Sequence, residues 1–137
     1  MNVIMLLEKM GEEIGVRYLP SKIHEIIDYT SKMLDNGRII TLSDESGLLG
    51  VMYFSVTDDY EPFLKKGEFE FKSHDPEAKT IYVEKMISRK WNKEIRLEFE
   101  KEVMKRYPWV NQCIGHRRSK NGDRKVLNKR RLKYVSN

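Results

Sequence analysis

Three cations stand close together where a strand-like segment leads into a helical one. Thr80–Ile87 alternates apolar and polar side chains, as a strand does, and residues 95–106 carry the amphipathic pattern of a helix. Arg89, Lys90 and Lys93 lie at the junction. Because a helix N-terminus presents free amides and positive potential, cations placed beside it favour anion binding. The spacing therefore predicts that this turn can hold an anion.

The C-terminal part of the chain is strongly basic. Residues 116–137 contain nine Lys or Arg residues and one acid, a net charge of +8, so residues 1–115 sum to −3 within a total of +5. A local basic stripe is typical of proteins that contact phosphate-bearing partners. The alternative is a solvated edge strand that lysines protect from aggregation. The candidate polyanion contacts are Arg117, Arg118, Lys120, Arg124, Lys125, Lys129, Arg130 and Arg131.

Length and composition indicate one globular domain spanning residues 1–137, with 39% hydrophobic and 34% charged residues. Cys113 is the single cysteine, which excludes an intrachain disulfide and a multi-cysteine metal site, and we expect a buried, inert thiol. His74 and Asp75 have no second pair of ligands nearby, so no metal site is predicted. His24 is expected to be a surface or helix-packing histidine.

No apolar run approaches the roughly 20 residues that a membrane span needs. The first eight residues lack the basic region of a signal peptide, and Glu8 and Lys9 interrupt their apolar run. We therefore expect a cytoplasmic protein with no membrane partner.

The N-terminal half predicts two helices and a hairpin. A helix at 2–12 precedes a second at 21–35, which Ser21 caps and Asn36-Gly37 ends. Strands at 38–42 and 48–56 follow, and the second is apolar on both faces, so it should be central with helices on both sides. Gly50 within it indicates a bulge or a close backbone approach. A short strand is expected at 68–72.

The C-terminal half predicts a strand, a helix, a strand and a hairpin. Asn92 is a sound N-cap, and residues 109–116 read as a strand parallel to 79–87 through a right-handed crossover. Asn121-Gly122 is a two-residue hairpin signal, which would pair 114–119 with 123–133. The expected buried face of the helix comprises Trp91, Ile95, Phe99, Val103 and Tyr107.

This order of elements, with Leu48-Leu49-Gly50 entering the second strand, resembles the GNAT acetyltransferase superfamily over most of residues 18–117. The resemblance implies an α/β fold with a GNAT-like mixed central sheet, helices on both faces and, here, a C-terminal basic β-hairpin. In that family the strand before the central helix splays from the next strand. The pantetheine of acetyl-CoA enters the gap, and the pyrophosphate sits on amides of the following loop. The cofactor-binding residues implied are Met86, Ile87, Arg89, Lys90, Trp91, Asn92 and Lys93.

The same resemblance implies that Glu84 is the catalytic base for an amine substrate, whereas the alternation of its strand makes it an outward surface glutamate. Two features depart from the family pattern. Asn92 and Glu94 stand where the cofactor loop has glycines, and a basic hairpin replaces the helix that bears a tyrosine acid.

Three functions follow as alternatives. The first is an acyl-CoA-dependent N-acyltransferase with a divergent cofactor loop, using acetyl-CoA and no metal. The second is a non-catalytic basic module that binds nucleic acid or an acidic protein through the C-terminal hairpin. The third is a small interaction protein whose sheet edge docks a partner.

Overall fold

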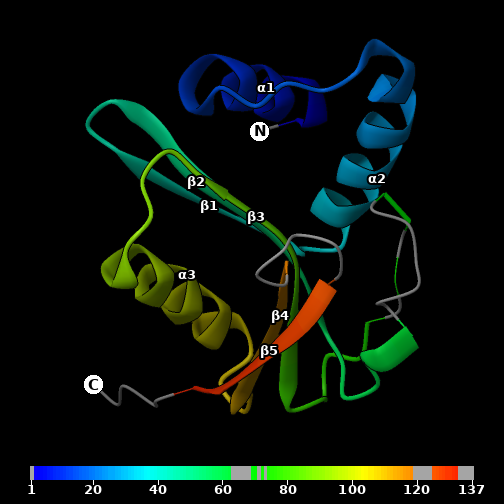
Figure 1. Ribbon diagram of the computed structural model, residues 1–137, viewed down its shortest axis with the longest axis vertical. Coiled ribbons are helices and arrows are strands. Elements are labelled where there is room, and N and C mark those ends of the chain that lie inside the picture. Colours follow the sequence, from blue (N-terminus) through cyan, green and yellow to red (C-terminus); the bar gives the residue numbers. More distant parts are fainter. Residues whose placement is uncertain (1, 63–68, 71, 73, 119–124, 133–137) are drawn as a thin grey trace.

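The computed structural model describes residues 2–62, 69–70, 72, 74–118 and 125–132, which form a mixed α/β fold. The sheet has the strand order β1-β2-β3-β4-β5, which follows the sequence (Figure 1). Its strands are β1 (Ile39–Asp44), β2 (Gly47–Val56), β3 (Thr80–Ser88), β4 (Gln112–Arg118) and β5 (Lys125–Arg131). All neighbours are antiparallel except β3 and β4, which are parallel because α3 (Lys93–Arg106) crosses between them.

The N-terminal helices end where glycines adopt left-handed backbone. Helix α1 (Val3–Lys9) is capped by Asn2, whose Oδ1 accepts from the Met5 amide at 2.9 Å, and runs on as the π-helix η1 (Met10–Ile14). Gly15, with φ of 85°, ends it, so this helix is longer than the predicted 2–12. Gly37, with φ of 65°, ends α2 (Ile23–Asp35) as predicted.

The predicted cap of α2 at Ser21 is wrong. Pro20–Lys22 forms the 3-10 helix η2, and α2 begins at Ile23 without a side-chain cap. Proline at the first helical position is pre-set for a helix and has no amide to satisfy, so the chain starts to turn before Ser21.

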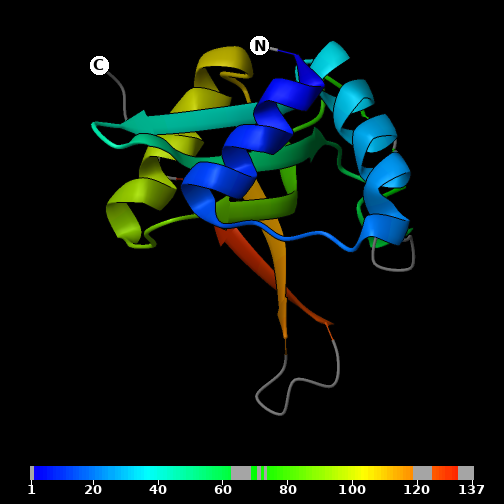
Figure 2. The same cartoon turned by 90° about the horizontal axis from the view of Figure 1, so that it is seen from above.

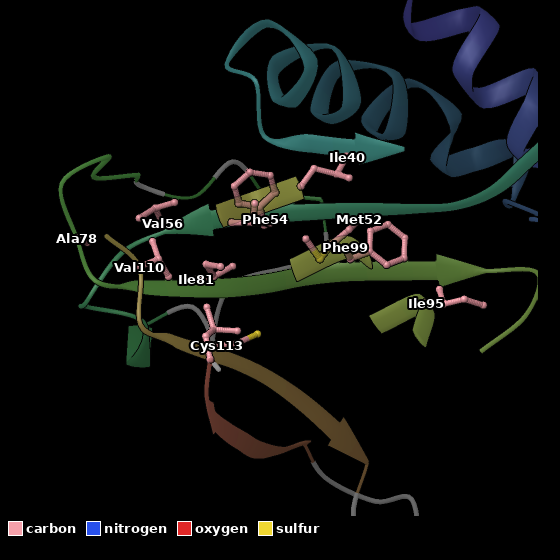
Figure 3. Packing of buried hydrophobic residues seen from close by; sticks show 12 residues of the cluster. Ile40, Met52, Phe54, Val56, Ala78, Ile81, Ile95, Phe99, Val110 and Cys113 are labelled. Carbon is pink, nitrogen blue, oxygen red and sulfur yellow. The ribbon is translucent and has the colours of Figure 1, made fainter. Parts of the chain in front are cut away.

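Each face of the sheet packs against helices. Ile95, Phe99 and Val103 of α3 pack on one face, where Figure 3 shows Phe99 beside Met52 of β2. On the other face, Leu6 and Met10 from the first helical segment and Tyr29 and Met33 from α2 pack against β1 and β2. Residues 50–57 are all buried, which confirms that β2 is a central strand covered on both sides.

Gly50 lets β2, β3 and α3 approach closely. A Cβ at this position would lie 3.0 Å from the carbonyl oxygen of Ile87 and 3.0 Å from Cζ of Phe99. The β1–β2 register also shifts between Leu42 and Ser43, so Leu49 is an extra residue in β2. Both expectations for this glycine, a bulge and a close approach, are met here.

Some expected elements differ. Of the predicted strand 68–72, the described residues 69, 70 and 72 are not in a strand, and β4 begins at Gln112 after Trp109 has formed a turn. The Asn121-Gly122 turn lies outside the described residues. Within the described part of the chain, no helix is long and apolar enough to cross a membrane.

Candidate functional site

Strands β3 and β4 pair over a short distance and then part. Their parallel pairing covers Thr80↔Gln112, Ile81↔Cys113 and Tyr82↔Ile114. Beyond these pairs β3 continues to Ser88 along β2, whereas β4 continues to Arg118 along β5. Beyond Tyr82 and Ile114, the facing edges of 83–88 and 115–118 are thus not paired with each other in the described sheet.

A bulge in β3 accompanies this divergence. The β2–β3 register shifts between Tyr53 and Phe54, so that Tyr53 pairs with Lys85 and Phe54 with Val83, which leaves Glu84 as an extra residue. A bulge bends its strand and increases the local twist. The extra residue Glu84 lies two positions after the last β3–β4 pair, where the bend of a bulge can separate the rest of β3 from β4.

Unpaired strand edges offer rows of backbone donors and acceptors. An extended ligand with amide groups can add to such an edge and take up those hydrogen bonds. The edge of β3 beyond Tyr82 is thus suited to an extended ligand that carries amide groups.

Glu84 is not a surface residue. Its side chain is 1% exposed and lies in an ion-pair network. One carboxylate oxygen accepts from the Tyr29 hydroxyl at 2.8 Å and from Lys72 Nζ at 3.3 Å. The other accepts from Arg38 at 2.9 Å and from the Ser55 hydroxyl. The interpretation of Glu84 as an outward glutamate is therefore wrong, because the bulge directs its side chain toward α2.

The same network links Tyr29 of α2, Arg38 and Lys72 to strands β2 and β3. Arg38, which is fully buried, also donates to the carbonyl of Phe54 at 3.0 Å and to the carbonyl of Lys72 at 2.9 Å. Burial and the Glu84 carboxylate together raise the pKa of Tyr29, and they raise that of Tyr82 to about 12. Sequence reasoning missed Arg38, Lys72, Tyr29 and Ser55. The one available signal was Arg38 at the start of an apolar strand.

Arg89 binds the β1–β2 hairpin. Its guanidinium donates to Asp44 at 2.7 Å and to the Leu48 carbonyl at 3.3 Å, and its amide donates to the Leu49 carbonyl at 2.8 Å. The Arg89 hydrogen bond is the main reason that the pKa of Asp44 is lowered. Arg89 is therefore already paired with Asp44, so less of its positive charge is available to a bound anion.

The other loop cations are more open. Lys90 and Lys93 are exposed, and the Trp91 side chain is 56% exposed, so the prediction that Trp91 belongs to the buried face of α3 is wrong. Asn92 caps α3 as predicted, its Oδ1 accepting from the Ile95 amide at 2.9 Å. This cap takes one of the first-turn amides that an anion would otherwise reach.

The structure also describes the surroundings of His74, Cys113 and His24, which the sequence analysis considered. His74 Nδ1 accepts from the Val56 amide at 2.9 Å, and Nε2 lies 3.2 Å from the Tyr107 hydroxyl. Burial lowers the pKa of His74. Cys113 is buried, and burial raises its thiol pKa to about 11, in line with the predicted inert thiol. His24 is exposed.

The C-terminal cations fall into three groups. Lys120 and Arg124 lie outside the described residues. Arg117, Arg118 and Lys125 occupy register positions in β4 and β5. Of the remaining three, Arg130 forms an ion pair with Glu100 of α3, whereas Lys129 and Arg131 are exposed. Among the described residues, no group of three or more His, Cys, Asp or Glu could hold a metal ion.

No protein-family model and no curated protein matches the chain. Among solved structures, it is similar to the loading GNATL domain of CurA from Lyngbya majuscula, with 13% identical residues and a TM-score of 0.49. The match covers 87% of this chain, which spans 60% of that domain's length. Similarity at this level establishes neither a family nor an activity.

Proposed function

We propose that this chain has a GNAT-like fold and binds an acyl-CoA thioester between β3 and β4, from which it transfers the acyl group to an amine. One observation carries the proposal. The parallel pairing of β3 and β4 stops after Tyr82↔Ile114, although both strands continue. The resemblance in element order implies a splay between the strands that flank the central helix, and this divergence occupies that place.

The unpaired edge of 83–88 suits pantetheine because that arm is extended and contains amides. Met86 and Ile87 lie on this segment, with Met86 packed toward the α3 core and Ile87 toward the opposite core. The strand is therefore fixed from both faces, while its edge toward β4 is not paired with β4 beyond Tyr82. A rigid edge lowers the entropy cost of ordering a flexible ligand.

The phosphate end of the ligand would rely on side chains. Lys90 and Lys93 are exposed near the start of α3, where the helix dipole adds positive potential. Glu94 in the first turn opposes a phosphate, and Asn92 and Arg89 are already engaged. We therefore expect Lys90 and Lys93 to supply most of the charge, with a weaker phosphate contact than a glycine-lined loop gives.

In the proposed reaction the amine nitrogen bonds to the thioester carbonyl carbon and the carbon–sulfur bond breaks. The proton that the amine loses ends on the departing thiolate. Glu84 remains the candidate for assisting this proton transfer, but its side chain is 1% exposed and its carboxylate already contacts Arg38 and Lys72. An amine therefore has no open approach to this carboxylate. We therefore propose that Glu84 chiefly positions the bulge of β3.

A substitution at Gly115 tests whether acetyl-CoA binds between β3 and β4. This glycine is the first β4 residue beyond the last pair with β3, and a Cβ built on it meets no described atom within 4 Å. Gly115→Trp should therefore fold normally while it fills the space beside β4. Titration calorimetry with acetyl-CoA should show binding by the wild type and at least about tenfold weaker binding by Gly115→Trp, a loss of about 1.4 kcal/mol.

Lys101→Trp is the matched control, because it adds the same side chain on the exposed side of α3. Its affinity for acetyl-CoA should equal that of the wild type. The proposal fails if the wild type releases no heat with acetyl-CoA, or if a folded Gly115→Trp binds as tightly as the control.

A further inference from the structure

The register of the β4–β5 hairpin sorts its cations onto two faces. Residues directly opposite each other in an antiparallel pair share a face, and alternate pairs share the same face. One face carries Cys113↔Arg130, Gly115↔Asn128 and Arg117↔Val126, and the other carries Gln112↔Arg131, Ile114↔Lys129, His116↔Leu127 and Arg118↔Lys125. Four of the six cations in these strands, Arg118, Lys125, Lys129 and Arg131, thus belong to one face.

The face with fewer cations lies against α3. Arg130 pairs with Glu100 of α3, and the side chains of these two residues are 31% and 10% exposed. Cys113, opposite Arg130, is buried in the α3 core. Arg130 is therefore already paired with an acid, and we do not count it among the cations available to an external partner.

On the cation-rich face, the structure describes the side chains of two cations, Lys129 and Arg131. Both are exposed, and neither forms an ion pair with a described residue. The register also sets Arg118 directly opposite Lys125. A local cluster of cations is the electrostatic footprint expected for a phosphate-bearing partner.

We propose that this face of the hairpin, whose described cations are Lys129 and Arg131, binds the phosphate backbone of a nucleic-acid duplex. Strands β4 and β5 project from the body of the molecule in Figure 2, so the ribbon can enter a groove or lie along a backbone. A two-stranded ribbon is one of the shapes that the major groove of B-DNA admits.

An acidic protein fits this face less well. Protein interfaces have an apolar centre with aromatic or aliphatic anchors, and lysine is depleted there. The exposed large hydrophobic side chains in the described part of the chain are Ile4, Met5, Leu19, Trp91, Leu97 and Trp109, and none of them is on β4 or β5. Among its described side chains, the face offers charge without an exposed apolar anchor, which suits phosphates and predicts binding without sequence preference.

The test measures affinity for a DNA duplex of about 20 base pairs, two helical turns, over a series of salt concentrations. Removing one cation that touches a phosphate reduces the slope of log affinity against log salt by about 0.9. Lys129→Gln with Arg131→Gln should therefore lower the magnitude of the slope by about 2 and weaken binding at low salt. Both positions are exposed, so the variant should melt as the wild type does.

Two controls separate a site from general charge. Lys101→Gln with Lys105→Gln removes the same charge from α3, where Glu98 and Glu102 already pair with these lysines, and should leave the slope unchanged. Arg130→Gln should also leave it unchanged.

A slope in Lys129→Gln/Arg131→Gln equal to that of the wild type would overturn the proposal. So would tighter binding of polyglutamate than of the duplex. Gly115→Trp should bind DNA normally, which keeps this test separate from that of the acyl-CoA gap.

Discussion

Glu84 differs from a glutamate on an exposed strand in two ways. It is the extra residue of a β-bulge, and hydrogen-bond donors contact both of its carboxylate oxygens. Its carboxylate contacts Arg38, Lys72, Tyr29 and Ser55, and its side chain is 1% exposed. Removing one partner of a buried ion pair leaves the other charge uncompensated, which costs far more than the pair itself contributes. The network therefore fixes the bulge that directs β3 away from β4.

Glu84→Gln should strongly destabilise the fold. The amide keeps the shape of the side chain but leaves Arg38 and Lys72 without their anion and places an N–H among donors. We expect the free energy of unfolding to fall by about 3–5 kcal/mol in urea denaturation. The control Glu98→Gln, whose partner is Lys101 on the surface of α3, should change it by less than about 1 kcal/mol. Equal changes in the two variants would refute the structural role of the network.

His74 should make stability depend on pH. Protonation of Nδ1 would break the hydrogen bond that it accepts from the Val56 amide, and burial lowers the pKa of His74 below its usual 6.5. The unfolded chain therefore takes up this proton at a higher pH than the folded chain does. The His74 contribution is complete above about pH 6.5 and is lost as the pH falls toward the folded pKa.

Denaturation curves recorded between pH 7.5 and pH 5, a span of about 2.5 units around the histidine pKa, would measure this effect. The wild type should lose more stability on acidification than His74→Gln. His24→Gln, changed at an exposed histidine, should follow the wild type. Parallel curves for the wild type and His74→Gln would show that His74 does not contribute.

At the scale of helices and strands, the sequence predicted the features that depend on residues close together in the chain. Asn92 caps α3, Gly37 ends α2, and the glycine in β2 marks both a bulge and a close approach. The predicted N-cap at Ser21 was wrong because Pro20, its neighbour, starts a 3-10 turn first. Trp91 failed because apolar spacing along a helix does not show where the helix begins, and α3 starts at Lys93.

The divergence of β3 and β4 could not be read from the residues, although the family resemblance implied it. A bulge appears only when two strands are set in register, and the shift at Tyr53/Phe54 has no local sequence signature. The Glu84 network depends in the same way on residues distant in the chain, since Arg38 and Glu84 lie 46 positions apart. Pairing across such separations is determined by tertiary packing, which a single sequence does not reveal.

At the scale of the molecule, the two proposed sites share β4. Its edge toward β3 borders the gap, and its other edge pairs with the basic strand β5. The sequence placed the positive charge correctly along the chain, but the structure divides it, since Arg89 pairs with Asp44 and Arg130 with Glu100. Among the residues whose side chains the structure describes, Lys90 and Lys93 beside the gap and Lys129 and Arg131 on the hairpin are exposed cations.

Amide hydrogen exchange with and without acetyl-CoA tests the central claim most directly. Bound pantetheine would take up the unpaired edge of β3, so acetyl-CoA should slow exchange in residues 83–88 and in the facing part of β4 from Gly115. The same ligand should leave β1 and α2 unchanged. Two results would contradict an acyl-CoA site between β3 and β4. One is that acetyl-CoA leaves exchange in residues 83–88 unaltered. The other is that it slows exchange only in β5, as binding of its phosphates alone would do.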